Sequence, residues 1–300
     1  MRTVYLGTSE FAADVLRALA QSPHRPSLVV TRPDRPRGRG RKLAAPPVAA
    51  AAGALQIPLD QPESVNDEPA RRRIAAELPD AVCVCAFGAL IKEPLLSGHL
   101  ILNVHPSLLP RWRGAAPIER AIMNGDDRTG VSIIRLTAGL DSGPVCLAQE
   151  EPIAPDDDYG SLATRLAGIG GRLLVRVLDN LPDGLVFREQ DEAGATYAEK
   201  ITAADRLLDP ERPAEELARV VRALSPHVGA AVTLKDGSRL GVWRAAARPA
   251  SPGDPAPGEL SLDGPEPVLG CTPGTLALTL VQPAGRRAMP GDAYLRGLRG

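Results

Sequence analysis

The chain has few aromatic residues, and its glycines and prolines follow no period. Only nine of its 300 residues are Phe, Tyr or Trp. The hydrophobic core must therefore be built from Ala, Leu, Val and Ile, and an aromatic side chain beside a polar motif becomes a candidate for a binding site. The 29 glycines and 30 prolines are spread without a repeat, which excludes a collagen-like chain.

The chain also lacks a strong net charge and a long apolar run. Its 35 basic and 36 acidic side chains give a formal net charge of -1. No stretch reaches the roughly 18 apolar residues that a membrane span requires. Because Met1 leads almost directly into a strand-like apolar run, we expect no signal peptide and a cytoplasmic location. The length predicts two domains.

Cysteine is scarce as well. Cys83 and Cys85 share one face of a predicted strand, whereas Cys146 and Cys271 stand alone. This spacing indicates neither a disulfide framework nor a CxxC zinc pair. We expect small buried thiols in a reducing compartment, and no metal site.

The first 180 or so residues have the pattern of an α/β fold. The first predicted helix carries Phe11, Val15 and Leu19 at four-residue spacing, and a closing helix has apolar residues spaced by threes and fours from Leu162 to Leu181. Apolar strands alternate with the helical stretches, and they are predicted at residues 2–6, 27–31, 81–86 and 100–104. This alternation predicts a doubly wound, mostly parallel sheet.

The pattern changes after this domain. Residues 188–205 are polar, and a short helix then carries Leu217, Val220, Val221 and Leu224. Brief strand-like runs between Gly- and Pro-containing turns follow at residues 231–234, 240–243 and 275–280. They predict a smaller all-β domain, a partly open barrel. The predicted division is a first domain at 1–188, a linker at 189–205 and a second domain at 206–300.

A doubly wound sheet often binds a dinucleotide at the turn after its first strand. Here that turn reads Gly7-Thr8-Ser9-Glu10. It lacks both the GxGxxG spacing and a Walker lysine. We interpret it as an ordinary strand-to-helix turn that is capped by Thr8 or Ser9.

The densest chemistry lies in residues 103–114, which read NVHPSLLPRWRG. Asn103 and His105 are two apart at the end of a predicted strand, so both side chains point to one face at the carboxyl edge of the sheet, where such sheets bind ligands. An amide donor beside an imidazole is what an acyl transfer through an oxyanion requires. A lone histidine at a strand end is more often structural, but this whole string is far rarer.

A second polar segment places Asp141 between two glycines, in the sequence GLDSGP at residues 139–144. Alone, such an aspartate usually forms a turn. Beside the first segment it supplies a carboxylate that can hold a water or fix the tautomer of His105.

The third feature is the basic segment, residues 32–42, with six cations and one anion. Prolines and glycines interrupt it, so we expect it to form neither helix nor strand. It is either a solvated loop or a contact for a polyanion, with nucleic acid as the obvious partner. Because it follows the second predicted strand, it lies on the same sheet edge as Asn103, which favours the contact.

Together these segments resemble the methionyl-tRNA formyltransferase family over nearly the whole chain. Asn-x-His with Ser-Leu-Leu-Pro, and the later Gly-Leu-Asp-Ser-Gly, are shared by all 10-formyltetrahydrofolate-dependent transferases and their hydrolase relatives. More particular to the tRNA enzymes are four motifs, namely PDRP with GRG at residues 33–40, PRWRGAAP at 110–117, YAEK at 197–200 and QPAG at 282–285.

The resemblance implies a Rossmann-like formyltransferase domain and a smaller OB-like barrel that holds the tRNA acceptor arm. It implies a catalytic group made of Asn103, His105 and Asp141. The folate site is expected to include Phe87, Gly88, Leu90, Ser107, Leu108, Leu109 and Pro110. The tRNA contacts are expected at Arg35, Arg37, Arg39, Arg41 and Lys42. A monomer is expected.

The implied reaction moves the formyl group of 10-formyltetrahydrofolate to the α-amino group of methionyl initiator tRNA. Asn103 and protonated His105 would stabilise the tetrahedral oxyanion, and Asp141 would support the charge on His105 and position a water. One alternative is a formyltransferase acting on a small amine such as glycinamide ribonucleotide or an amino sugar. Another is an RNA-binding module on a degenerate enzyme fold.

The sequence departs from the family at two places. The family often has a tryptophan where Leu207-Leu208-Asp209-Pro210 stands, and Pro-Trp-Pro where Ser225-Pro226-His227-Val228 stands. Both lie outside the predicted catalytic segments, so they concern domain packing or the fit of tRNA rather than the reaction.

Overall fold

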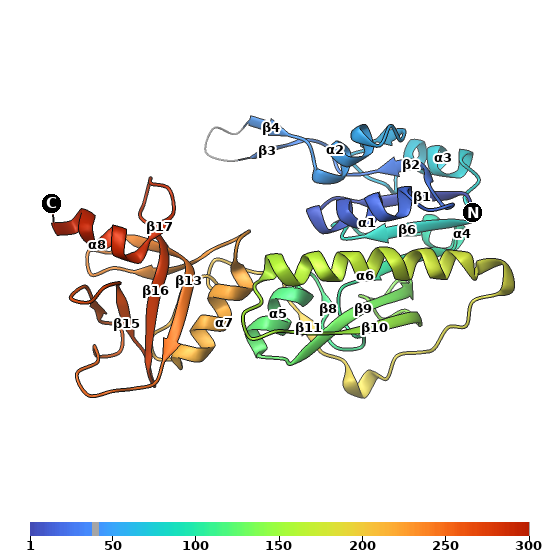
Figure 1. Ribbon diagram of the computed structural model, residues 1–300. Helices are drawn as coiled ribbons and strands as arrows, with labels where there is room; N and C mark the ends of the chain where they lie inside the picture. Colours follow the sequence, from blue (N-terminus) through green and yellow to red (C-terminus); the bar gives the residue numbers. More distant parts are fainter. Residues whose placement is uncertain (38–41, 300) are drawn as a thin grey trace. The chain divides into compact units, whose positions relative to one another are not determined.

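A computed structural model of the chain describes residues 1–37 and 42–299. The chain divides into two compact units (Figure 1). Unit 1 comprises Met1–Gly114, Thr129–Glu151 and Ala163–Tyr197, and unit 2 comprises Ala115–Arg128, Pro152–Leu162 and Ala198–Gly300. Two segments of the first 188 residues therefore belong to the second unit.

Unit 1 is built on a seven-stranded sheet with the order β10-β9-β7-β6-β1-β2-β5. The five strands from β7 to β5 are parallel, and β9 runs antiparallel to β7. This confirms the mostly parallel sheet. The strands are β1 (Thr3–Gly7), β2 (Pro26–Val30), β5 (Leu59–Asp60), β6 (Ala81–Cys85), β7 (Ile101–His105), β9 (Arg128–Arg135) and β10 (Val145–Pro152).

Helices cover both faces of this sheet (Figure 1). On one face lie α1 (Glu10–Ala20) and α6 (Tyr159–Asp179), and α2 (Pro47–Ala54) packs along α1. The helix α6 approaches β7 so closely that a Cβ added to Gly170 would lie 2.8 Å from Val104. The other face carries α3 (Glu68–Ala76) and α4 (Leu95–Gly98), whose Ile74 and Leu95 pack in a core cluster with strand residues.

The turn after β1 caps a helix, as its sequence indicates. Ser9 is the N-cap of α1, and its hydroxyl accepts a hydrogen bond from the Ala12 N–H at 3.2 Å. The hydroxyl of Thr8 instead donates to the carbonyl of Phe87 at 2.7 Å. This bond ties the loop after β1 to the loop after β6.

The alternation of side chains along β7 determines where the polar residues point. Ile101 packs in the same cluster as Ile74, on the α3 and α4 face, whereas Val104 faces α6. Asn103 and His105 share the parity of Ile101, so they lie on the α3 and α4 face at the carboxyl end of the strand. Their register partners on β9 are Ile134 and Ser132.

The basic segment does contain strands, so the expectation of neither helix nor strand was wrong. β3 (Arg35–Arg37) pairs antiparallel with β4 (Lys42–Ala44), and Figure 1 shows the pair as a narrow two-stranded projection. Pro36 lies opposite Leu43 in this ladder. A ladder of only two strands has two open edges, so a proline that lacks an N–H can be accommodated there.

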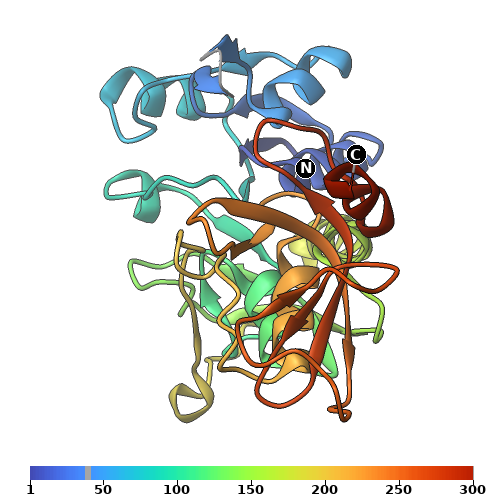
Figure 2. The same cartoon turned by 90° about the vertical axis from the view of Figure 1, so that its left-hand side faces the viewer.

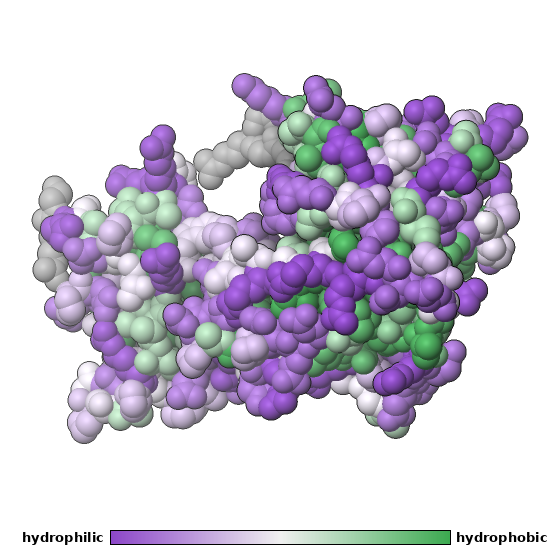
Figure 3. Space-filling view, turned by 45° about the vertical axis from the view of Figure 1, so that its right-hand side comes forward, coloured by the Kyte–Doolittle hydropathy of each residue, from purple (hydrophilic) through white to green (hydrophobic). Residues whose placement is uncertain are grey.

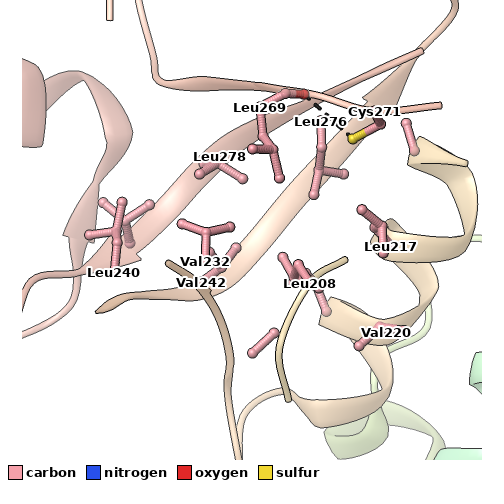
Figure 4. Close-up of a cluster of buried hydrophobic side chains, with 14 of the residues drawn as sticks. Leu208, Leu217, Val220, Val232, Leu240, Val242, Leu269, Cys271, Leu276 and Leu278 are labelled. Carbon is pink, nitrogen blue, oxygen red and sulfur yellow. Dashed lines mark hydrogen bonds between the residues drawn. The ribbon is translucent and has the colours of Figure 1, made fainter. Parts of the chain in front are cut away.

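Unit 2 contains an antiparallel sheet with the order β12-β13-β16-β15-β14, and β17 pairs with β16 (Figure 2). Its strands are β12 (Ala230–Thr233), β13 (Arg239–Arg248), β14 (Leu260–Ser261), β15 (Val268–Gly270), β16 (Thr275–Gln282) and β17 (Met289–Pro290). The helix α7 (Ala214–Leu224) closes its core, where Leu217 and Val220 meet Leu276 and Leu278 (Figure 4). The strands that the sequence indicates are confirmed.

Helices contribute more to unit 2 than an all-β prediction allows. The missed helix α8 (Gly291–Arg299) buries Leu295, although its glycines lower its helix propensity. The helix α5 (Pro117–Asn124) packs against α7, where Arg219 donates to the carbonyl of Met123. His227, at one of the family departures, stacks on Tyr159 with ring centroids 3.7 Å apart.

The surface drawn in Figure 3 is largely hydrophilic, with smaller hydrophobic areas between the polar residues. No helix formed by residues 1–37 and 42–299 is long and apolar enough to cross a membrane. Cys83, Cys85 and Cys271 are buried free thiols and Cys146 is half-buried.

Candidate active site

Asn103, His105 and Asp141 meet in unit 1. The first two extend from the end of β7, and Asp141 lies in the loop between β9 and β10. The Asn103 amide donates to Asp141 Oδ1 at 3.3 Å, and His105 Nδ1 lies 3.6 Å from Asp141 Oδ2. The Asn103 and His105 residues are only 8% and 4% exposed. Two segments 38 residues apart thus form one buried polar cluster.

The carboxylate of Asp141 is also held by the backbone. The N–H of Gly114 donates to Asp141 Oδ2 at 2.9 Å, so both carboxylate oxygens accept a hydrogen bond. Asp141 has a φ of 46°, in the left-handed region that side chains other than glycine rarely adopt. Strained backbone of this kind persists only where surrounding contacts hold it in place, and it is common at active sites.

The orientation of His105 follows from its second ring nitrogen. Nε2 lies 2.9 Å from the carbonyl oxygen of Trp112, which can only accept, so Nε2 carries a proton. In the neutral ring, Nδ1 is then the unprotonated nitrogen, and it faces Asp141. Trp112 is itself left-handed, with a φ of 63°. Any proton exchanged by this histidine therefore passes through the atom next to the carboxylate.

The loop after β7 is fastened to β9. Ser132 of β9 donates to the carbonyl of Ser107 at 2.8 Å and accepts from the N–H of Leu109 at 3.2 Å. Ser107 in turn donates to the carbonyl of Arg111 at 2.6 Å. Ser107 and Ser132 are fully buried. Their hydroxyls take over backbone hydrogen bonds that a loop cannot make by itself.

The residues predicted for folate lie in two neighbouring loops. Phe87, Gly88 and Leu90 follow β6, while Ser107, Leu108, Leu109 and Pro110 follow β7, and these two strands are parallel neighbours. Ser107 and Phe87 are buried, whereas Leu90 is 66% exposed. Both loops leave the sheet at the edge where Asn103 and His105 lie. Within these loops the carbonyls of Phe87, Gly88 and Leu90 accept hydrogen bonds from Thr8, Arg32 and Asn66, so the backbone there is fixed, while the side chain of Leu90 offers apolar surface to solvent.

Of the residues predicted to contact tRNA, Arg35 and Lys42 are exposed on β3 and β4. Arg35 forms an ion pair with Glu63 at 2.9 Å. Arg37 ends β3, and Arg39 and Arg41 lie outside the described residues. At the base of the segment, Arg32 donates to the carbonyl of Gly88 at 3.4 Å, which links it to the predicted folate loop.

Sequence reasoning missed a strap, residues 188–197, that lies against the site. Gln190 donates to the carbonyls of Asp141 and Gly143, both at 2.7 Å. Arg113, only 2% exposed, donates to Gln190 and to Glu192. The hydrogen bond with Glu192 raises the pKa of Arg113 and lowers that of Glu192. Residues 189–197 of the strap fall within the predicted linker, because their polar side chains show no periodicity. The PRWRGAAP motif contains Arg113, but nothing in the sequence pairs this arginine with the strap.

Within residues 1–37 and 42–299, no three His, Cys, Asp or Glu side chains are grouped so that they could hold a metal ion. The ionisable residues near β7 are instead paired with each other and with backbone amides. The N–H groups of such a cluster can stabilise a developing negative charge, and its carboxylate can accept a proton. An acyl transfer requires both functions.

Two family patterns match the chain. Residues 1–178 match the family described as formyl transferase, and residues 200–299 match the formyl transferase C-terminal domain. Among solved structures, HypX from Aquifex aeolicus in complex with tetrahydrofolic acid superposes with a TM-score of 0.68 at 18% identity, over 98% of this chain but 47% of that one. This chain therefore spans about half the length of HypX, and at such identity the likeness shows the fold.

A second solved structure is an N-formyltransferase from Helicobacter canadensis in complex with folinic acid and dTDP-3-aminofucose. Its TM-score is 0.67 at 13% identity, over 92% of this chain and 98% of that one.

Curated relatives are far more similar in sequence. The methionyl-tRNA formyltransferase of Methylococcus capsulatus is 42% identical over 98% of this chain and 96% of its own length. That of Acidithiobacillus ferrooxidans is 44% identical, over 99% and 96%. The chain belongs to the methionyl-tRNA formyltransferase family, whose members use a folate-derived formyl donor.

Proposed function

We propose that this chain transfers the formyl group of 10-formyltetrahydrofolate to the α-amino group of methionyl initiator tRNA, and that Asn103, His105 and Asp141 carry out the chemistry. The observation that supports this most strongly is the convergence of these three side chains at the carboxyl end of β7. The two relatives named above, which carry the name of that activity, support the choice of substrate.

In the proposed reaction the neutral α-amine attacks the formyl carbon. A C–N bond forms, and the formyl oxygen takes up negative charge. The Asn103 amide has two N–H donors, and its bond to Asp141 uses one, so the other is assigned to this oxygen. A protonated His105 carries its second proton on Nδ1, the atom next to Asp141, because its Nε2–H is directed to Trp112, and its positive charge adds to the stabilisation of this oxygen.

We assign to Asp141 the transfer of the proton that the attacking nitrogen loses. The attacking nitrogen must lose a proton, and the folate nitrogen must gain one as its bond to the formyl carbon breaks. The carboxylate lies between the donors of Asn103, Gly114 and His105, so it can accept the first proton directly or through a water. Returning that proton to the leaving nitrogen completes the transfer with no net change in the enzyme.

The folate donor is assigned to the loops of Phe87, Gly88 and Leu90 and of Ser107, Leu108, Leu109 and Pro110. The tRNA is assigned to the basic segment, through Arg35, Arg37, Arg39, Arg41 and Lys42, and to unit 2. We infer a monomeric enzyme. The division into 1–188, a linker at 189–205 and 206–300 holds along the sequence, while residues 115–128 and 152–162 fold with unit 2 and the linker up to Tyr197 folds with unit 1. The segment fits RNA because phosphate contacts are made mainly by exposed arginines and lysines.

Labelled 10-formyltetrahydrofolate tests this proposal. It is incubated with the chain and methionylated initiator tRNA, glycinamide ribonucleotide, or an amino sugar nucleotide of the kind bound by the Helicobacter relative. We expect label as N-formylmethionine on the tRNA, at a rate far above that of either small amine. Equal or faster labelling of a small amine would overturn the assignment of substrate, and label on none would overturn the reaction.

A further inference from the structure

The strap joins the two segments that carry the site. At one end, the backbones of Arg188 and Val145 exchange two hydrogen bonds, at 2.8 and 2.9 Å. Near the other end, Thr196 accepts from the N–H groups of Trp112 and Arg113, through its hydroxyl and its carbonyl, both at 2.8 Å. The strap is therefore bound to the loop that orients His105 and to the strand that follows Asp141.

Gln190 lies between these two attachments, and its amide is fully used. Its Nε2 donates to the carbonyls of Asp141 and Gly143. Its Oε1 accepts from Arg113 Nε at 3.0 Å and from Arg113 Nη2 at 2.9 Å. An amide has two donors and two acceptor lone pairs, so all four are satisfied. The partners also fix its orientation, since carbonyls only accept and a guanidinium only donates.

Gln190 binds the backbone of the turn at residues 141–143, and the conformation of this turn sets the direction of the Asp141 carboxylate. Asp141 is in the left-handed region, and a Cβ added to Gly143 would lie 1.9 Å from the carbonyl oxygen of Arg135. The turn is therefore pressed against β9 in a conformation that it would not adopt alone. Without the two N–H donors, the carbonyls of Asp141 and Gly143 lose their partners, and the turn can relax.

Arg113 holds the side chain of Gln190 through two hydrogen bonds to its amide oxygen. Its side chain is 2% exposed, whereas that of Glu192 is 71% exposed, so a buried guanidinium is neutralised from the surface. The planar fork of an arginine reaches Gln190 and Glu192 at once, which a lysine cannot do. A buried cation of this kind is retained only with such partners, because an unpaired buried charge is strongly destabilising.

We propose that Gln190, fixed by Arg113, is a positioning residue for formyl transfer: it holds the Asp141 turn so that the carboxylate faces Asn103 and His105. The inference rests on the proposed function, because it requires Asp141 to take part in the reaction. Gln190 touches no reacting group, so its effect is on turnover through geometry. Displacing a reacting group by about 1 Å can lower a rate by roughly a hundredfold.

The sharpest test is Gln190→Glu. Glutamate keeps oxygens for Arg113 but removes both donors to the Asp141 turn and places a carboxylate against two carbonyls. We expect kcat to fall roughly 10- to 100-fold, while KM for tRNA and for the formyl donor stays within about twofold. Gln149→Glu, the same change at an exposed position of β10, is the matched control and should behave like the parent.

Arg113→Lys should lower kcat in the same direction, because charge is kept but the fork is lost. Should Gln190→Glu be unfolded at the assay temperature, Gln190→Met, which removes the same donors without adding charge, replaces it. Turnover within about twofold of the parent in a folded Gln190 variant, with turnover lost in Asp141→Asn, would overturn the inference alone. Near-normal turnover in Asp141→Asn would overturn the proposed function as well.

Discussion

Two segments leave the same edge of the unit 1 sheet and differ in nearly every physical respect. Residues 106–114, after β7, are bound to β9, to the strap and to Asp141, and Arg113 among them is buried. The basic segment, after β2, exposes Arg35 and Lys42 and is attached mainly at its base. The first segment holds atoms in fixed positions, as chemistry requires. The second exposes positive charge, which suits the proposed contact with tRNA.

The largest effect that this contrast predicts is in the first segment. Replacing Asn103 by alanine removes the proposed oxyanion donor, and one such donor contributes about 2.7–4 kcal/mol to transition-state stabilisation. We expect kcat of Asn103→Ala to fall at least a hundredfold, with little change in tRNA binding, measured by steady-state kinetics and filter retention. Asn180→Ala, at an exposed asparagine of unit 1, is the control. Normal turnover in Asn103→Ala at saturating substrates would remove Asn103 from the mechanism.

A second prediction concerns the free energy of unfolding. It compares a side chain that holds the loop after β7, Ser132, with one that holds the basic segment, Gln61. Ser132→Ala leaves the carbonyl of Ser107 and the N–H of Leu109 without their buried partner, which costs about 1–3 kcal/mol. Gln61→Ala removes exposed hydrogen bonds to Arg32 and Asp34, and changes at such surface positions usually stay within about 0.5 kcal/mol. Urea unfolding measures both. Equal losses would mean that the two segments are held alike.

Arg39 tests whether the basic segment acts in binding alone or also in the catalytic step. It lies outside the described residues, and the resemblance to the family is what assigns it to the tRNA. A hydrogen bond to a charged group contributes about 1.5–3 kcal/mol, so a contact made only in the transition state predicts at least a tenfold loss of kcat. We expect Arg39→Ala to lower kcat and raise KM together, and Arg39→Lys to recover part of the loss. An effect on KM alone would leave the basic segment as a general attractor.

The smallest effects are expected for Arg35 and Lys42, whose charges lie on exposed strands. Neutralising each with glutamine should raise KM for tRNA a few-fold and reduce the slope of log affinity against log salt by about 0.7–0.9 per lost phosphate contact. Turnover at saturating tRNA should stay constant. Titrating salt with each variant measures the slope, and a constant slope would show that neither side chain touches phosphate.

Much of this architecture could be predicted because it depends on short-range pattern. Apolar alternation in residues 100–104 predicts β7, and the two-residue spacing of Asn103 and His105 predicts that they share a face. The cap at Ser9 and the helix α7 follow from equally local signals. Asp141 could be paired with His105 only from their complementary chemistry and from the resemblance, since no local pattern connects residues 36 apart.

What could not be predicted depends on partners far away in the sequence. Gln190 and Arg113 are 77 residues apart and meet only because the strap crosses both loops. The strands β3 and β4 form despite Pro36, because an open edge of a two-stranded ladder needs no N–H from this residue. Likewise, α5 belongs to unit 2 because its apolar face finds α7, and a chain cut near residue 205 would leave that face uncovered.

The buried thiols give each unit its own reporter of unfolding. Burial raises the pKa of Cys83 and of Cys85 to about 12 in unit 1, and that of Cys271 to about 11 in unit 2. Only a thiolate reacts rapidly with an alkylating reagent, so these sulfurs should be protected in the native state and labelled once their own unit opens. With Cys146 replaced by serine, brief alkylation at rising urea followed by peptide mapping would yield a separate denaturation curve for each unit from one sample.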